Sequence, residues 1–358
     1  MSFNFDTASS CGIYYANESV DSDLTKVRLH HLDIIESGFV FVRRGLAHGV
    51  MDNCNIQGSM DMAGTVGLWG ADNGAAAYEF GNASNFYFED NAWTPYSQSE
   101  SFFQAGNGDG RYAFRYNAMT LPDDTMTSPL FDLHGNQSSA DSGFGAELYG
   151  NSVTAPYNGP QHFYAQRGGK SLVFDNFVNM SYSGATSTWA IEEHLDSETS
   201  FPTQAYNGQP QHVSDSYYWS NFRNSEILNP SSETTLYYSD LGRDVPMADY
   251  DVWLYTASFD GSSGVGCGTL SARPAACAIG VGYWATDQSC SDLTGMAGAH
   301  PSTPISGTLY RCTAPDTWTA YYTPLPYPHP LRTDCALYPT LCDPAGPRPR
   351  APTGLTVI

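Results

Sequence analysis

The sequence is poor in positive charge. Its 358 residues include 15 Lys and Arg against 37 Asp and Glu, which gives a formal net charge of -22. Nucleic acids and anionic membranes bind cationic surfaces, so a generally negative field disfavours both partners. The same balance favours cations, and Ca²⁺ is the one cofactor that it suggests.

Several recognisable motifs are also missing. There is no apolar run of about 18 residues that could span a membrane, and no N-terminal leader with charged and apolar regions. We therefore expect the start at Met1 to belong to a mature or truncated product, or the protein to be exported by a route without such a leader. The catalytic signatures GxSxG, Walker A and HExxH are absent, and no CxxC pair stands at zinc spacing.

The eight cysteines are unevenly distributed, because six of them fall in the last third of the chain. This pattern favours disulfides in an oxidising compartment, which predicts an extracellular protein or one on a cell or virion surface; cytosolic thiols are the alternative. Cys54 is interpreted as a buried thiol or as the partner of Cys11. For the other six we expect neighbours in sequence to pair: Cys267 with Cys277, Cys290 with Cys312, and Cys335 with Cys342.

The chain is rich in aromatic residues (14%) and contains 34 Gly and 22 Pro, a profile typical of turn-rich β-proteins. Within it one phrase repeats, in which alternating apolar residues lead to an Asn and then, two residues later, to a large apolar side chain. Its five copies are FYFEDNAW (Asn91), YAFRYNAM (Asn117), AELYGNSV (Asn151), SLVFDNFV (Asn176) and SYYWSNFR (Asn221). Repetition at unequal intervals predicts a solenoid whose turns differ in loop length.

The parity of the phrase predicts which side chains face inward. Three residues before each Asn stand Phe88, Phe114, Leu148, Val173 and Tyr218, and two residues after most of them stand further apolar side chains. Like residues of stacked coils lie about 4.8 Å apart, so the Asn amides could bond along a ladder. We therefore expect an all-β chain folded as a right-handed parallel β-helix; the alternative is a β-sandwich, which gives no reason to align Asn in every coil.

The composition changes after about residue 240, where strand phrases give way to a Cys-, Gly- and Pro-rich stretch. We predict an entry segment over 1–24, the β-helix over 25–240, an irregular disulfide-pinned extension packed on the helix over 241–345, and a linker-like tail over 346–358. The extension would protect the exposed edge or flank of the helix.

Several phrases resemble a known family: GRYAFRYN, FDLHG, GAELYGN, RGGKSLVFDN, VGYWATDQ, LYRCTAPDTWTAYYTP and YPHPL. They are similar to secreted right-handed parallel β-helix proteins of the pectate-lyase-like superfamily, in a branch of bacterial and phage-associated proteins. The resemblance covers roughly residues 25 to 335. It implies additional N-terminal coils in other members and a surface that faces a polysaccharide, on which such enzymes perform β-elimination of uronates.

Outward-facing residues of the repeat supply candidate ligand contacts. Tyr149, Phe174 and Trp219 occupy one column and could stack on sugar rings; the alternative is that the C-terminal tail packs its own Tyr and Trp there. Arg111, Arg115, Arg167 and Lys170 gather scarce positive charge that could hold an anionic glycan. The alternative for these residues is pairing with Glu147 in a structural network.

Two further clusters are candidates for chemistry. In FDLHG, Asp132 and His134 stand two apart on one strand, so Asp132 could orient His134 as a base, with Arg115 beside them; a turn-anchoring hydrogen bond is the alternative. In AIEEHLDSE, Glu192, Glu193 and Asp196 could offer oxygen ligands to Ca²⁺, although the spacing matches no calcium motif.

The sequence thus leads to two functional hypotheses. The first is a secreted or surface β-helix that recognises an extracellular polysaccharide along its outer sheet, with cleavage by a lyase or hydrolase mechanism left open. The second is a non-catalytic structural, adhesin-like or filament-forming protein that associates with other copies through its helix ends.

Overall fold

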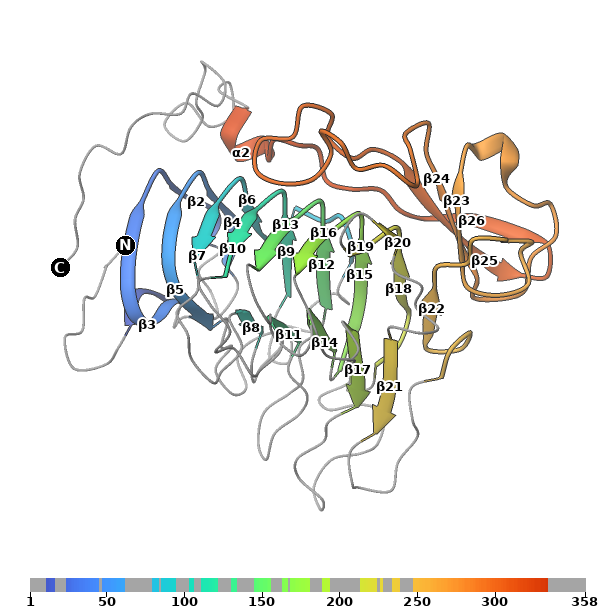
Figure 1. Ribbon diagram of the computed structural model, residues 1–358, viewed down its shortest axis with the longest axis horizontal. Coiled ribbons are helices and arrows are strands. Elements are labelled where there is room, and N and C mark those ends of the chain that lie inside the picture. The colour runs from blue at the N-terminus through green and yellow to red at the C-terminus, as the bar shows by residue number, and fades with distance from the viewer. Residues whose placement is uncertain are drawn as a thin grey trace.

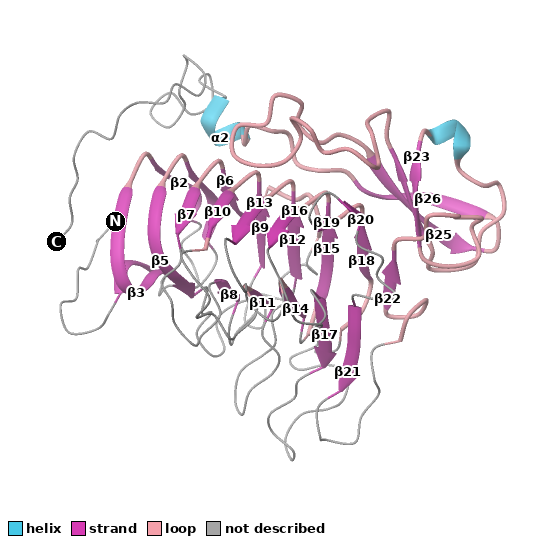
Figure 2. Ribbon diagram, in the orientation of Figure 1, coloured by secondary structure: helices cyan, strands magenta, loops and turns pink. Residues whose placement is uncertain are grey.

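A computed structural model describes residues 11–16, 24–44, 47–61, 79–83, 85–94, 103–105, 111–121, 130–133, 145–155, 163–166, 168–180, 189–193, 213–223, 226–227, 234–238 and 247–333. The described chain is almost entirely β-structure (Figure 2). Its strands form long parallel sheets whose neighbours come from successive turns of the chain, as expected for a parallel β-helix (Figure 1).

The first sheet has eight strands, one from each coil. In spatial order they are β2 (Leu24–His30), β4 (Ala47–Asp52), β6 (Phe86–Glu89), β9 (Arg111–Arg115), β12 (Gly145–Tyr149), β15 (Lys170–Phe174), β18 (Ser216–Trp219) and β22 (Val252–Leu254). β22 lies beyond the predicted end of the helix at residue 240, a position outside the described residues.

The other two faces of the helix, which we call the second sheet and the third sheet, are joined at β5 (Asn55–Asp61) into a continuous set of 14 strands. The second sheet includes the strands that begin directly after the five ladder Asn residues. It comprises β1 (Cys11–Ala16), β3 (Asp33–Arg44), β5, β7 (Ala92–Thr94), β10 (Ala118–Thr120), β13 (Ser152–Ala155), β16 (Phe177–Met180), β19 (Phe222–Arg223) and β20 (Glu226–Ile227). The third face continues from β5 through β8 (Phe103–Ala105), β11 (Phe131–Leu133), β14 (Tyr164–Gln166), β17 (Trp189–Glu193) and β21 (Thr234–Tyr238).

The predicted inward columns form the core. Phe88, Phe114, Leu148 and Val173 on the first sheet are fully buried, and they belong to one cluster with Trp93 of the second sheet and Phe131 of the third. The Phe114 ring lies 5.5 Å from that of Trp93 and 4.9 Å from that of Phe131. Three faces therefore close around one apolar interior.

The Asn ladder is confirmed. The Asn117 side-chain amide donates to Asn151 Oδ1 (3.1 Å) and to the Phe88 carbonyl (2.9 Å), while the Asn117 backbone N–H donates to the same Asn151 oxygen (3.0 Å). The pattern repeats from Asn91 through Asn117, Asn151 and Asn176 to Asn221. Each amide is buried, and each bond satisfies a group whose loss of water would otherwise be costly.

The residue before each ladder position turns the chain through the left-handed region. Positive φ is found at His31, Asn53, Asp90, Tyr116, Gly150, Asp175 and Ser220. Tyr116 is the bulky exception, since φ is 55° there. Its hydroxyl accepts a hydrogen bond from the Ile305 N–H (3.0 Å), so a contact with the C-terminal region holds this corner.

After β22, residues 255–333 form the C-terminal region, a small structure built on the side of the helix (Figure 1). Its four-stranded sheet has the order β23 (Val265–Gly268), β24 (Gly282–Ala285), β25 (Thr308–Ala314) and β26 (Thr317–Tyr322). A 3-10 turn, η1 (Leu270–Ala272), and a short helix, α2 (Pro330–Thr333), complete it.

The predicted disulfide pairing was wrong for four cysteines. The bonds join Cys267 to Cys290 and Cys277 to Cys312, each with Cα atoms 6.0 Å apart. Strand pairing decides the partners, because Cys312 exchanges backbone hydrogen bonds with Gly280 and Val281, directly after Cys277. Cys54 is a buried free thiol, and Cys335 and Cys342 lie outside the described residues.

Candidate functional site

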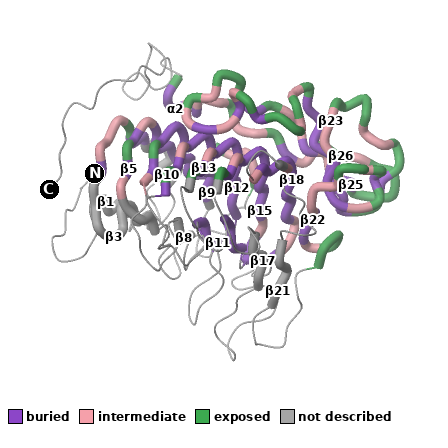
Figure 3. Tube along the Cα trace, viewed as in Figure 1, coloured by how far each residue is buried: buried purple, intermediate pink, exposed green. Residues whose placement is uncertain are grey.

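The predicted ligand strip of the first sheet is closed to solvent. Arg115, Glu147, Tyr149 and Phe174 are fully buried, and Trp219 is 1% exposed. The aromatic column stacks on itself, with Phe174 4.7 Å from Tyr149 and 4.2 Å from Trp219 between ring centroids. Trp284 and Tyr322 of the C-terminal region pack against Phe174, so the alternative of a tail-covered strip is the arrangement found (Figure 3).

Arg115 is held by the C-terminal region as well as by the helix. Its guanidinium pairs with Glu89 (2.7 Å) and donates to the carbonyls of Leu325 (2.5 Å) and Pro326 (3.0 Å). These carbonyls begin the strap, which we define as residues 325–333. The expected catalytic and ligand-binding role of Arg115 would require a guanidinium open to solvent, and the strap closes it.

The strap is fixed by a buried cluster of opposite charges. The Arg332 guanidinium lies 2.6 Å from Glu89, 2.7 Å from Asp90 and 3.4 Å from Asp52, whose carboxylates have no exposed surface. Arg28 also pairs with Asp52 (2.7 Å). Burial alone would raise the pKa of the Glu89 carboxyl, but the two arginines beside it, Arg115 and Arg332, lower it to about 2.

Glu147 has a structural environment too. Its carboxylate accepts hydrogen bonds from the Gly81 N–H (2.7 Å), the Asn85 amide (3.1 Å) and the Tyr322 hydroxyl (2.9 Å). Burial raises the pKa of this carboxyl despite those donors. Glu147 thus joins β12 to β26 and to the segment around Gly81.

The remaining candidates do not converge on one described site. Asp132 is buried on β11 of the third sheet, whereas Lys170 lies on the first sheet with its ammonium 5.1 Å from the Phe80 ring. Arg111 lies two strands from Lys170, since both pair with Gly145, but its side chain is outside the described residues. The same holds for His134, Arg167 and Asp196 and for the side chains of Glu192 and Glu193.

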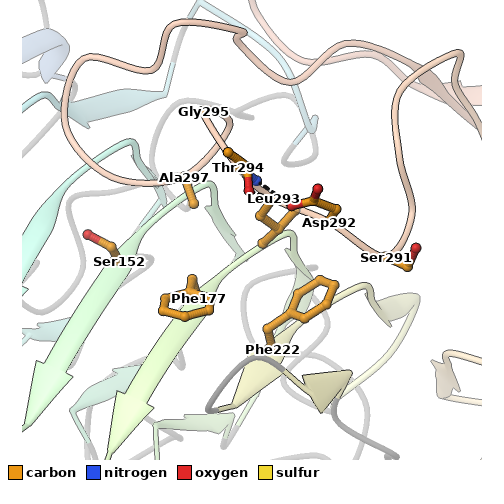
Figure 4. Close-up of a pocket in the computed structure, with 9 residues that line it drawn as sticks. All are labelled: Ser152, Phe177, Phe222, Ser291, Asp292, Leu293, Thr294, Gly295 and Ala297. Atoms are coloured by element: carbon orange, nitrogen blue, oxygen red, sulfur yellow. Dashed lines mark hydrogen bonds between the residues drawn. The ribbon is translucent and has the colours of Figure 1, made fainter.

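An open groove lies instead on the second sheet, where the loop 291–297 crosses its outer face (Figure 4). It has a volume of about 370 Å³. Figure 4 shows Phe177 and Phe222 on the sheet side and the loop opposite them. The lining residues are Ser152, Phe177, Phe222, Ser291, Asp292, Leu293, Thr294, Gly295 and Ala297.

The floor of the groove is an interruption of a small-residue column. The positions directly after the ladder Asn are Ala92, Ala118 and Ser152 in three coils, but Phe177 and Phe222 in the next two. These two residues pair directly across β16 and β19, so their rings arise from neighbouring strands. The sequence analysis missed the groove because it sought ligand contacts among the positions before each Asn. The change from Ala or Ser to Phe occurs at the position directly after the Asn and is visible in the sequence.

The loop that forms the opposite wall is anchored at both ends. Cys290 ties its start to Cys267, and the Gly298 N–H donates to the Gly150 carbonyl (2.8 Å) at the corner of the helix. Within the loop, Asp292 Oδ1 accepts hydrogen bonds from the Thr294 hydroxyl (2.6 Å) and N–H (2.9 Å), and these bonds lower the pKa of the Asp292 carboxyl. The groove therefore has an apolar floor and a wall that carries fixed side-chain oxygens.

Comparison with protein-family models, with curated proteins and with solved structures finds no match to this chain. In the described residues, no helix is long and apolar enough to cross a membrane. Within the same ranges, no three His, Cys, Asp or Glu side chains are grouped so that they could hold a metal ion. The candidate site consequently depends on the geometry of the groove alone.

Proposed function

We propose that this protein is an extracellular β-helix that recognises a glycan without cleaving it, and that the groove over Phe177 and Phe222 is its binding site. The single observation that carries the proposal is the partly buried Phe177 ring, which lies beside the buried Phe222 of the neighbouring strand and faces a loop with side-chain oxygens (Figure 4). Pyranose rings present apolar faces to aromatic rings and hydroxyl edges to polar groups, which is the combination that this groove offers.

The fixed loop supports this role. A binding wall that is already ordered loses less conformational entropy when a ligand binds. The Cys267–Cys290 disulfide, the turn at Asp292 and the Gly298 contact each restrict the loop before any ligand arrives. The disulfides also agree with an oxidising environment outside the cell.

The described groups that line the groove support recognition without cleavage. Glycoside hydrolysis ordinarily uses two carboxyl groups on opposite sides of the bond, and the described lining residues supply one, Asp292. β-Elimination requires a base together with a cation that offsets the uronate charge, and none of the described lining residues is a cation. We therefore place binding, and no catalytic step, in this groove.

The test is direct binding of soluble oligosaccharides by calorimetry, after a glycan panel has identified the best of them. Phe177→Ala should weaken binding at least about fivefold, because stacking on an aromatic ring is lost. The control is Thr120→Ala, because Thr120 is an exposed residue of β10 in the same sheet and does not line the groove. Equal affinity of the parent and Phe177→Ala would refute the groove as the site.

The second candidate is a non-catalytic structural or adhesin-like protein that associates through its helix ends. The observation that favours it is that the C-terminal region covers the aromatic and charged side chains at the centre of the first sheet, Glu89, Arg115, Glu147, Tyr149 and Phe174 among them, and so leaves them closed to a ligand. A glycan panel without any binder, together with concentration-dependent association in sedimentation, would support this candidate over the first.

A further inference from the structure

We infer that the groove selects neutral glycans and excludes polyuronates, and that Asp292 determines this choice. The inference rests on the proposed function, and it replaces the expectation of an anionic ligand held by basic residues. It depends on the charge inside the groove, on how Asp292 is fixed there, and on where the positive charges of the described chain are engaged.

Among the described residues that line the groove, one has an ionisable side chain. Among its nine lining residues Asp292 is acidic, two are phenylalanines, and the others are small, hydroxylated or aliphatic. Two hydrogen bonds from Thr294 stabilise the ionised form of Asp292, so the carboxylate stays charged at neutral pH. A uronate in this groove would meet a like charge, and none of the described lining residues is a cation that could offset it.

Asp292 retains bonding capacity for a hydroxylated ligand. Thr294 occupies Oδ1, and a carboxylate has two oxygens that each accept more than one hydrogen bond. Sugar hydroxyl groups can donate to these free positions, whereas a sugar carboxylate has no proton to donate at neutral pH. The same side chain therefore attracts a neutral sugar and repels an acidic one.

Of the four basic residues predicted to hold uronates, Arg115 and Lys170 have contacts on the first sheet, and the side chains of Arg111 and Arg167 lie outside the described residues. Arg115 and Arg332 are enclosed in the cluster beneath the strap, and Arg311 pairs with Asp215 (2.6 Å). Lys170 lies over the Phe80 ring on the first sheet. The net charge of -22 adds a general repulsion of polyanions that these enclosed cations do not reverse locally.

The chain supplies a matched control for Asp292. Asp260 is also an exposed acid in a turn, and its Oδ1 accepts hydrogen bonds from the Ser262 N–H (2.9 Å) and hydroxyl (2.6 Å). It does not line the groove. Asp260→Asn and Asp292→Asn change the net charge equally, and each keeps an Oδ1 that can accept the same turn hydrogen bonds, so a difference between them isolates the position of the charge.

The experiment compares a neutral β-linked gluco-oligosaccharide with an oligogalacturonate of equal length, at low and at physiological salt. We expect the parent and Asp260→Asn to bind the neutral probe at least tenfold more tightly than the acidic one at low salt. Asp292→Asn should reduce that ratio by about fivefold, and added salt should reduce it in the parent, because both changes weaken charge repulsion.

Three outcomes separate the inference from the proposed function. If the oligogalacturonate binds the parent as tightly as the neutral probe, and Phe177→Ala weakens both, the groove binds glycans but the inference is wrong. If Asp292→Asn and Asp260→Asn give the same ratio, the charge of Asp292 does not determine selection. If neither probe nor any member of a neutral panel binds, the proposed function itself is wrong.

Discussion

The first and second sheets, which meet at the Asn ladder, differ in how far their outer faces are exposed to solvent. On the first sheet, Glu89, Arg115 and Glu147 are buried by the C-terminal region, whereas on the second sheet Ala92 is exposed and the groove is open. On the first sheet, Glu89 pairs with Arg332 of the strap and Glu147 accepts a hydrogen bond from Tyr322, so both carboxylates are held by the C-terminal region. Charge on an outer face of this protein therefore marks a contact within the chain, and a ligand site must be sought where the cover ends.

The largest effect is expected in the buried cluster around Arg332, which holds the strap on the first sheet. Arg332→Ala leaves Asp52, Glu89 and Asp90 without one of their cations, and removing one member of a buried ion pair costs about 3–5 kcal/mol of folding free energy. Arg311→Ala is the control, since the Arg311–Asp215 pair is partly exposed and should contribute about 1 kcal/mol or less. Urea unfolding measures both; equal losses would show that the strap cluster does not seal the first face.

The two disulfides stabilise the C-terminal region, which covers the first sheet. Replacing both Cys277 and Cys312 by Ser should destabilise the C-terminal region by about 2–4 kcal/mol, because the bond closes a loop across 35 residues. Non-reducing peptide mapping checks the connectivity first. Fragments that join Cys267 to Cys277, in place of Cys267 to Cys290, would contradict the arrangement of β23, β24 and β25.

The Asn ladder tests the scaffold that both faces share. Asn151→Leu should destabilise the protein by roughly 1–3 kcal/mol, because the amides of Asn117 and Asn176 lose their partner in a buried position. Asn179→Leu, at an exposed position of the next coil, should have little effect. If chemical denaturation gives similar losses for the two variants, the ladder does not stabilise the coils.

The acid response distinguishes the two buried glutamates of the first face. The pKa of Glu89 is lowered from 4.5 to about 2, so its ionised form stabilises the fold above pH 4.5 and this contribution is lost as the pH falls toward 2. The pKa of Glu147 is raised, so its contribution to stability is present at low pH and is lost as the pH rises through the folded-state pKa. The free energy of unfolding, measured between pH 6 and 2, should therefore fall less steeply in Glu89→Gln than in the parent, and Glu147→Gln should not flatten it.

The repeat and the inward columns could be predicted from the sequence because each coil imposes the same physical demand on the same positions. Asn117 and Asn151 bond to each other, so their alignment in sequence reports their contact in space. The cover could not be predicted in this way. Glu89 and Arg332 lie 243 positions apart, and nothing in the local sequence of either one indicates its partner.

The groove was missed for a different reason. Phe177 and Phe222 were visible as departures from Ala and Ser, but the wall opposite them comes from a loop whose position depends on Cys267 and Cys290. Pairing neighbouring cysteines in sequence gave the wrong bonds and could not place that loop. Long-range pairing within the C-terminal region thus limited both the prediction of the cover and that of the site.

The most direct measurement of the central claim compares the accessibility of the two faces in the native protein. Ala113 on β9 is fully buried and Ala92 on β7 is exposed, so each is replaced by Cys and labelled with a thiol reagent, with peptide-resolved mass spectrometry to separate the sites. Buried Cys54 serves as an internal reference. We expect rapid labelling at residue 92, and labelling at residue 113 only as fast as the protein unfolds. Equally rapid labelling at both positions would show that the C-terminal region does not close the first sheet to solvent.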